Sequence, residues 1–236
     1  MSGSFAGKTV MITGAAGAFG RHLSQAFAAE GARLVLVDVS APALHAAAPQ
    51  NGKNVKLLEL DLLEEKTVRD VITKLQSEVG GIDVLCAVAG GFHMGEPVHE
   101  ISSDAWKLMD DLNVQTLLNT LRAVAPGMEA AGAGKIITMG ANSALTGVPL
   151  MGAYCASKAQ VMRITESLSG ELRKKGINVN CVLPTIIDTP ANRNVMPNAD
   201  PAHWIAPEDL AEVFKFLASN AANAVHGALV PVAGLS

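Results

Sequence analysis

Strand-like and helix-like segments alternate along almost the whole chain, and this alternation limits the fold more than any other feature of the sequence. Seven short segments are rich in β-branched residues, are bounded by Gly, Pro or Asp, and are mostly unbroken apolar runs. Such runs are typical of parallel strands whose two faces are both covered by helices. The pattern predicts an α/β fold with a doubly wound, seven-stranded parallel sheet. The predicted strands are 8–13, 33–38, 55–60, 83–88, 135–139, 177–183 and 228–232.

Helical periodicity fills the segments between the strands. We expect long helices near 104–131 and 153–175, and a last helix from about Pro207 to Ser219. No repeat, low-complexity tract or linker divides the 236 residues, so residues 1–236 are expected to form a single domain. The one irregular stretch, 188–206, is rich in Pro, Asn and Asp. Its length inside a compact domain predicts a lid over a functional site.

A turn rich in glycine and alanine follows the first strand, from Thr13 to Gly20. Gly14 permits a tight turn, and the small Ala18 and Gly20 let the backbone approach a pyrophosphate group. A helix that begins near Phe19 would offer free N–H groups and the positive end of its dipole to that anion. Together with the alternation, this turn predicts a Rossmann fold that binds a dinucleotide.

Asp38 ends the second strand, where an acidic residue can hydrogen-bond the ribose diol of the adenosine. A carboxylate there repels the 2′-phosphate of NADP, and the turn itself carries no Lys or Arg to neutralise such a phosphate. Arg21 follows the turn directly and leaves NADP binding open. The sequence therefore favours NAD over NADP as the cofactor.

Tyr154 and Lys158 are four residues apart at the start of the helix predicted over 153–175. This spacing places both side chains on one face of the helix, one turn apart. The ammonium of Lys158 could then lower the pKa of the Tyr154 phenol, so that the tyrosine passes a proton near neutral pH. Beside a bound nicotinamide, the pair predicts a general acid/base.

The combination of these motifs resembles the short-chain dehydrogenase/reductase family over essentially the whole chain. The resemblance rests on Thr-Gly-x-x-x-Ala-x-Gly in the first turn, Asp61 and Leu62 after the third strand, Asn113 in a central helix, and Tyr-x-x-x-Lys. It implies NAD(P)(H)-dependent hydride transfer between the nicotinamide and a carbonyl or alcohol substrate, with the tyrosine as general acid/base. It also implies a homodimer or homotetramer built on the two long helices.

The resemblance further implies roles for individual residues. Asp61 would touch the adenine amino group, Lys158 would also hold the nicotinamide ribose, and Asn113 would hold a water that relays protons from Lys158 to solvent. Ala89 and Gly90 follow the fourth predicted strand, and the resemblance implies that both contact the cofactor.

A later segment, Pro184 to Thr189, matches the family's Pro-Gly-x-x-x-Thr with Thr185 in place of glycine. By the same resemblance, Thr189 and the backbone at Ile187 would bind the nicotinamide carboxamide, next to Pro184.

Two departures from the family pattern leave the substrate open. The fourth strand ends Ala-Val-Ala-Gly where the family usually has Asn-Asn-Ala-Gly, and the usual catalytic serine position is occupied by Ala141. Ser143 is the nearest hydroxyl, and in an extended segment it would lie on the same side as Ala141. Both departures, together with the segment from Asp188 to Trp204, resemble the dihydropteridine reductase-like members of the family.

Two alternatives to a carbonyl or alcohol oxidoreductase therefore stay open. One is dihydropteridine reductase-like reduction of a quinonoid pterin, which needs a weaker oxyanion donor. The other is a non-catalytic NAD-sensing protein, which would need the cofactor site but not the proton relay. Phe92 and Trp204 could line a pocket for a flat substrate, although packing is the commoner role for such residues.

Composition argues against several other classes. The formal net charge is −4 and no basic cluster is present, so no nucleic-acid partner is expected. No apolar run approaches the roughly 20 residues that span a membrane, and residues 1–8 lack the features of a secretory signal. Three cysteines in apolar surroundings suit the reduced cytoplasm, and their spacing predicts no metal site: Cys86, Cys155 and Cys181. A small-molecule substrate is the expected partner.

Overall fold

The computed structural model describes residues 3–49 and 54–235, so the expected domain ends at 1 and 236 lie outside the described residues. Its strands form one sheet in the order β3-β2-β1-β4-β5-β6-β7, and every neighbouring pair is parallel. The predicted Rossmann fold is confirmed. The strands are β1 (Thr9–Thr13), β2 (Arg33–Asp38), β3 (Val55–Glu59), β4 (Val84–Ala87), β5 (Gly134–Met139), β6 (Ile177–Pro184) and β7 (Leu229–Val232).

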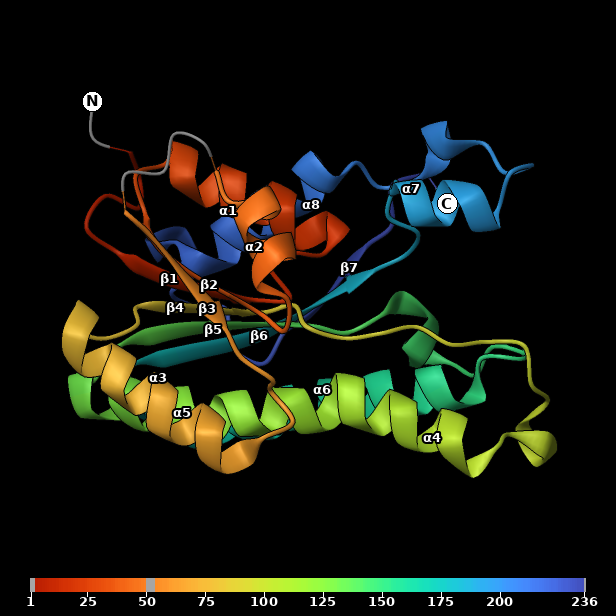
Figure 1. Cartoon of the computed structure of the whole chain (residues 1–236), viewed down its shortest axis with the longest axis horizontal. Helices are drawn as coiled ribbons and strands as arrows, with labels where there is room; N and C mark the ends of the chain where they lie inside the picture. The colour runs from red at the N-terminus through yellow and green to blue at the C-terminus, as the bar shows by residue number, and fades with distance from the viewer. Residues whose placement is uncertain (1–2, 50–53, 236) are drawn as a thin grey trace.

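Helices cover both faces of the sheet (Figure 1). On one side lie α1 (Ala18–Ala29), α2 (Ala41–Ala47) and α8 (Pro207–Ala218), and on the other lie α3 (Glu65–Val79), α5 (Thr116–Ala131) and α6 (Gly152–Leu172). Two shorter helices, α4 (Ser103–Asp110) and α7 (Pro190–Val195), precede α5 and follow β6. None of the helices within the described ranges is long and apolar enough to cross a membrane.

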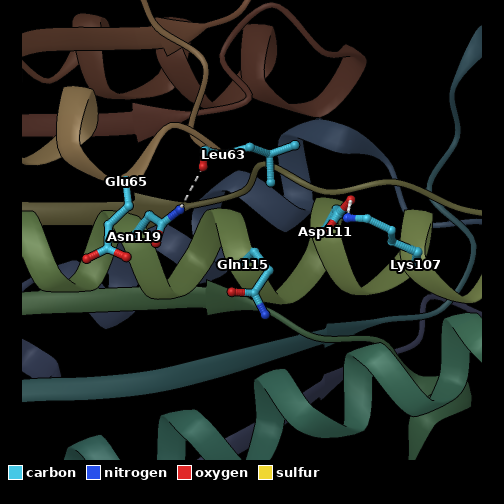
Figure 2. A pocket seen from close by; sticks show the side chains of 6 residues that line it. All are labelled: Leu63, Glu65, Lys107, Asp111, Gln115 and Asn119. Carbon is cyan, nitrogen blue, oxygen red and sulfur yellow. Dashed lines mark hydrogen bonds and ion pairs between the residues drawn. The ribbon is translucent and has the colours of Figure 1, made fainter.

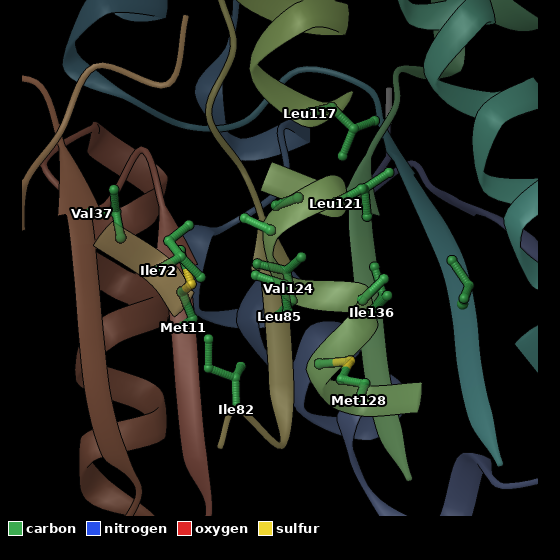
Figure 3. Packing of buried hydrophobic residues seen from close by; sticks show 14 of the residues in the cluster. Met11, Val37, Ile72, Ile82, Leu85, Leu117, Leu121, Val124, Met128 and Ile136 are labelled. Atoms are coloured by element: carbon green, nitrogen blue, oxygen red, sulfur yellow. The ribbon is translucent and has the colours of Figure 1, made fainter. Parts of the chain in front are cut away.

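The residues of each strand alternate between two separate cores, which explains the unbroken apolar runs. Met11 of β1 packs with Ile72, Leu85 and Val124 beneath α3 and α5 (Figure 3). Its neighbour Ile12 packs in the opposite cluster, beneath α1 and α8. From β1 the next two strands, β2 and β3, are added on one side, and β4 to β7 are added on the other. The order in which strands are added across the sheet therefore reverses between β1 and β4. The carboxyl ends of these strands therefore border the crevice where doubly wound folds bind their ligands.

The helix expected over 104–131 is interrupted by a π-helical turn, Asp111–Gln115. The N–H of Thr116 donates to the carbonyl of Asp111, five residues back, while the Thr116 hydroxyl donates to the carbonyl of Leu112 at 2.7 Å. One extra residue is thus accommodated between α4 and α5. Such π turns occur frequently at functional sites, and Asn113 lies inside this one.

The segment 188–206 is more regular than its composition indicates. It contains α7, whose first turn is capped by the Thr189 hydroxyl accepting from the Asn192 N–H at 3.2 Å, and a 3₁₀ turn, Pro201–His203. The segment is anchored at its base, where Ile187 and Ile205 form an isolated parallel bridge. Trp204 is only 8% exposed, so most of its side chain is packed against neighbouring residues.

Candidate active site

The glycine-rich turn is shaped by close contact with the end of β4. Gly14 has φ +65°, and a Cβ at this position would lie 2.8 Å from the Ala89 Cα. A Cβ on Gly20 would lie 2.3 Å from the carbonyl oxygen of Gly14. The Thr13 hydroxyl adds a tie, because it accepts from the N–H groups of Val88 and Ala89 at 3.2 Å each. Larger residues at 14 or 20 would therefore push the turn out of place.

The start of α1 is suited to an anion. Gly17 precedes Ala18 and Phe19 as the N-cap residue, and no side chain caps the helix there. The first N–H groups of a helix have no partner within the helix itself, and they point along the positive end of its dipole. The Phe19 side chain is buried against Phe214, with the ring centroids 5.3 Å apart, so only its backbone faces the turn. The residues present thus fit a bound pyrophosphate.

Asp38 lies at the end of β2 directly beside this turn, as the sequence predicts. Its two carboxylate oxygens accept from the N–H of Ala16 at 3.0 Å and from the N–H of Val39 at 2.9 Å. Arg21 also bonds to this turn, since its Nε donates to the Ala16 carbonyl at 2.9 Å. The negative charge of Asp38 is therefore held in one place by the backbone.

Asn119 of α5 positions the loop after β3, a role that the sequence did not indicate. Its Nδ2 donates to the carbonyl of Leu62 at 2.9 Å, and the Leu62 side chain is buried. Asp61 stays exposed and accepts from the N–H of Leu63 at 2.9 Å. Figure 2 shows the cavity of about 270 Å³ that adjoins this loop. It is lined by Leu63, Glu65, Lys107, Asp111, Gln115 and Asn119, none of which the motifs had selected.

Tyr154 and Lys158 both lie in the first two turns of α6, which confirms their predicted place on one helix. Lys158 is buried, and its Nζ donates to the carbonyl of Met139 at 2.9 Å. Burial lowers the pKa of Lys158 to about 8, although the nearby Cys181 acts in the opposite direction. Burial also raises the pKa of Tyr154 to about 12. The prediction that Lys158 lowers the phenol pKa is wrong here, because desolvation dominates and the ammonium is bonded to Met139.

Asn113 is buried and all polar atoms of its side chain are used. Its Oδ1 accepts from the N–H of Gly91 at 2.9 Å, while its Nδ2 donates to the carbonyl of Gly91 at 3.1 Å and to the hydroxyl of Ser157 at 3.0 Å. A Cβ on Gly90 would lie 2.5 Å from Asn113 Oδ1 and 3.2 Å from Lys158 Nζ. The structure thus brings Asn113, Lys158 and the Ala89–Gly90 backbone together.

The structure does not support the extended geometry expected around Ser143. Ala141 is buried and extended, but residues Asn142–Leu145 form a 3₁₀ turn, so the two-residue alternation ends there. Ser143 is half-buried, and its carbonyl accepts from the Cys155 thiol at 3.4 Å. The argument that placed Ser143 on the same side as Ala141 is therefore wrong.

The segment after β6 reaches the same edge of the sheet. Pro184 is buried at the end of the strand, and the Ile187 carbonyl accepts from Asn192 Nδ2 at 2.8 Å. Thr189 follows as the cap of α7. Next to it, both oxygens of Asp188 accept from Arg193 at 2.6 Å, and these hydrogen bonds lower the pKa of Asp188. Hydrogen bonds within the segment itself thus hold Asp188 and Thr189 at the start of the expected lid.

Ser157 is a site residue that the motifs did not select. Its hydroxyl accepts from Asn113 and donates to the carbonyl of Tyr154 at 2.8 Å. The signal was present, since Ser157 lies three residues after Tyr154 and therefore on its helix face. Its partner Asn113 could not be inferred from spacing alone. Within the described ranges, no group of three or more His, Cys, Asp or Glu residues is placed to hold a metal ion.

Several known proteins are similar to this chain in sequence. A family model described as short chain dehydrogenase matches residues 8–200. Sorbitol dehydrogenase of Cereibacter sphaeroides is 35% identical over 183 residues, which are 77% of this chain and 71% of that protein. Cis-4-hydroxycyclohexanecarboxylate dehydrogenase of Sinomonas cyclohexanicum is 31% identical over 244 residues, covering 99% of this chain and 98% of that protein.

The fold also matches a solved structure closely. The crystal structure of NAD+-bound xylitol dehydrogenase superposes with a TM-score of 0.90 over 98% of this chain and 99% of that chain, at 24% identity. At this identity the likeness supports the fold, while the family model and the two sequence relatives support the family. The chain belongs to the short-chain dehydrogenase/reductase family and is an NAD(P)-dependent oxidoreductase that transfers hydride between the cofactor and an alcohol or carbonyl substrate.

Proposed function

We propose that Tyr154 is the general acid/base of this oxidoreductase and that Lys158 and Asn113 support it. The observation that carries the proposal is the convergence of Lys158 Nζ and Asn113 Oδ1 on Gly90, at the carboxyl edge of the sheet. Tyr154 lies one helical turn from Lys158, so the phenol borders the same place. A buried lysine whose pKa is lowered to about 8 can exchange its proton near neutral pH, as a relay requires.

The nicotinamide would supply or accept the hydride when it is bound. The high pKa of Tyr154 keeps its phenol protonated, so in carbonyl reduction Tyr154 gives its proton to the substrate oxygen. In alcohol oxidation the phenolate form of Tyr154 takes the proton, and Lys158 passes it toward solvent, while Asn113 holds the loop after β4 in place through Gly91. Ala141 offers no hydroxyl, so Tyr154 is the main hydrogen-bond donor to the substrate oxygen. Ser143 stays the candidate for a second donor.

We propose NAD as the preferred cofactor, because the carboxylate of Asp38 is held beside the glycine-rich turn where it would meet a 2′-phosphate. The N–H groups at the start of α1 would hold the pyrophosphate. The residues proposed to contact the cofactor are Gly14, Ala18, Phe19, Gly20, Asp38, Asp61, Leu62, Ala89, Gly90, Tyr154, Lys158, Pro184, Ile187 and Thr189.

A small alcohol or its carbonyl partner is the proposed substrate class. The two sequence relatives named above are called sorbitol dehydrogenase and cis-4-hydroxycyclohexanecarboxylate dehydrogenase, which supports an alcohol. The pterin alternative is less favoured because the sequence relatives are named as alcohol dehydrogenases, and the NAD-sensor alternative is less favoured because it needs no proton relay. We further propose that segment 188–206 closes over the substrate.

For the assembly, we propose a homodimer or homotetramer built on α4–α5 and α6. Trp106 and Leu108 are exposed on α4, as expected of a helix that meets a second copy. Light scattering on the purified protein tests this, and a monomer at micromolar concentration would contradict it.

We also propose a cytoplasmic location, since the three cysteines are free and buried: Cys86, Cys155 and Cys181.

Substitution of Tyr154 by Phe tests the function. The variant should lose roughly 100- to 10,000-fold in kcat for alcohol oxidation with NAD+, because proton transfer of this kind contributes that much. Its Kd for NADH, measured by fluorescence titration, should stay near the wild-type value. Ser143→Ala provides the comparison and should lose much less activity. Activity that survives the loss of the phenol would refute the assigned mechanism.

A further inference from the structure

The loop after β4 exposes two large apolar side chains, while one polar atom in each of two neighbouring side chains is buried. Phe92 is 55% exposed and Met94 is 47% exposed. His93 lies between these two residues, and Glu96 follows Met94. Nε2 of His93 and Oε2 of Glu96 are buried and lie 3.4 Å apart, so the two polar groups face each other. A surface loop normally places its polar groups in water, and an exposed apolar cluster marks a binding surface.

A second loop adds to the same surface and is strained. Leu150 has φ +64°, and its carbonyl accepts from the N–H of Gly95 at 2.9 Å. The left-handed conformation costs a bulky residue on the order of 1–2 kcal/mol, and such strain is concentrated at functional sites. The Leu150 side chain is nevertheless exposed, as is that of Leu145 in the 3₁₀ turn after Ala141. The hydrogen bond thus joins the two apolar loops.

This surface adjoins Tyr154. The Phe92 and Tyr154 rings meet edge to face, with centroids 4.9 Å apart and planes at 76°. His93, Glu96 and Leu150 also line one small pocket with Gly152 and Ala153, the residues directly before Tyr154. Phe92 therefore borders Tyr154, and a substrate that brings its oxygen to the phenol can contact the Phe92 ring.

We propose that this apolar rim, formed by Phe92, Met94 and Leu150, binds the ring of an apolar cyclic secondary alcohol or of its ketone, in preference to an acyclic polyol. The inference rests on the proposed function, since it takes Tyr154 as the group that meets the reacting oxygen. An apolar ring gains free energy by covering the rim, whereas each hydroxyl of a polyol would lose water there without a compensating partner.

The reaction at this surface is ordinary alcohol oxidation. The carbinol C–H bond breaks and its electron pair leaves as hydride to NAD+, the hydroxyl proton passes to the phenolate oxygen of Tyr154, and the carbon–oxygen double bond forms. Reduction of the ketone is the same step in reverse. The rim contributes only to binding and orientation, so its effect belongs in KM more than in kcat.

The test compares cyclohexanol with xylitol as substrates of the intact protein with NAD+. We expect kcat/KM to favour cyclohexanol by about tenfold or more. Phe92→Ser should lower the ratio of kcat/KM for cyclohexanol to kcat/KM for xylitol by about tenfold or more, mainly by raising KM for cyclohexanol. Phe92→Leu, which keeps an apolar side chain, should retain most of the wild-type ratio. The matched control is Phe216→Ser, because Phe216 is 48% exposed but lies on α8, across the sheet from α6.

Three results would overturn the inference. Preference for xylitol with good turnover would refute the cyclic substrate and leave the proposed function intact. A change of oligomeric state in Phe92→Ser without a change in the ratio would show that the rim contacts another copy. The third result is a protein that binds NADH but oxidises neither cyclohexanol nor xylitol and reduces neither of the corresponding ketones. In that case the proposed function fails and the inference fails with it.

Discussion

Asn113 Nδ2 donates a hydrogen bond to Ser157 Oγ at 3.0 Å, and this contact joins the π-helical turn to the first turns of α6. The Asn113 amide has only one orientation available, since its Oδ1 accepts from the Gly91 N–H. Ser157 must then donate its own proton, which goes to the carbonyl of Tyr154. A directed chain of hydrogen bonds thus runs from the loop after β4 to the residue proposed as general acid/base.

Ser157 is therefore expected to position Tyr154 without touching the substrate. Ser157→Ala removes an acceptor and a donor from a buried network, and should lower the free energy of unfolding by about 1–3 kcal/mol. It should also lower kcat by about tenfold while the Kd for NADH stays nearly constant. Urea unfolding and steady-state kinetics measure both effects, and Ser157→Thr, which keeps the hydroxyl, should recover part of kcat.

Ser169→Ala is the matched control for Ser157. Ser169 lies on the same helix and is also buried, but its hydroxyl has no hydrogen-bond partner among the described residues. The control should leave kcat unchanged and should not destabilise the protein. Equal losses in both variants would show that Ser157 acts only through helix packing.

Gly20→Ala should abolish cofactor binding. The new Cβ would lie 2.3 Å from the Gly14 carbonyl oxygen, so the turn must shift away from the start of α1. We expect the Kd for NADH to rise by about 100-fold or more and the protein to lose on the order of 2 kcal/mol of stability. Gly147→Ala serves as control, because a Cβ there has no neighbour within 4 Å. Unchanged NADH affinity in Gly20→Ala would contradict the placement of the pyrophosphate.

Asp38 should determine the choice between the two cofactors. We expect kcat/KM for NAD+ to exceed that for NADP+ by about 100-fold, because the proposed cofactor position would bring a 2′-phosphate close to this fixed carboxylate. Asp38→Asn removes the charge and should reduce this ratio by about tenfold or more. Asp61→Asn should leave the ratio unchanged, since the adenine is common to both cofactors. Equal rates with NAD+ and NADP+ in the wild type would contradict the proposal.

Lys158 should make stability depend on pH. Its pKa is about 8 in the folded protein and about 10.4 in an unfolded chain, so between these values the unfolded state binds more protons. The free energy of unfolding should therefore rise with pH, by about 2 kcal/mol from pH 8 to pH 10, and Lys158→Met should lack this gain. Urea unfolding of both proteins at the two pH values measures the difference. Parallel behaviour of the two proteins would show that the pKa of Lys158 is not lowered in the folded protein.

The sequence by itself determined the sheet, the glycine-rich turn, the place of Asp38 and the shared helix of Tyr154 and Lys158. The strand predicted over 33–38 agrees with β2, Arg33–Asp38. These features follow from local rules: strand residues alternate between two covered faces, and a spacing of four keeps two side chains on one helix face. Such rules act within a few residues, so a single sequence is sufficient to apply them.

Only the tertiary structure decided what surrounds these residues. The contacts of Asn113 with Gly91 and Ser157 join positions 22 and 44 residues away, and the π-helical turn that contains Asn113 carries no local signal. Burial by the whole fold raises the pKa of Tyr154, against the local expectation from Lys158. Phe92 and Trp204 are chemically similar in sequence, yet one is exposed beside Tyr154 and the other is packed. Desolvation and side-chain exposure depend on which distant segments meet, and the local pattern of residues does not contain that information.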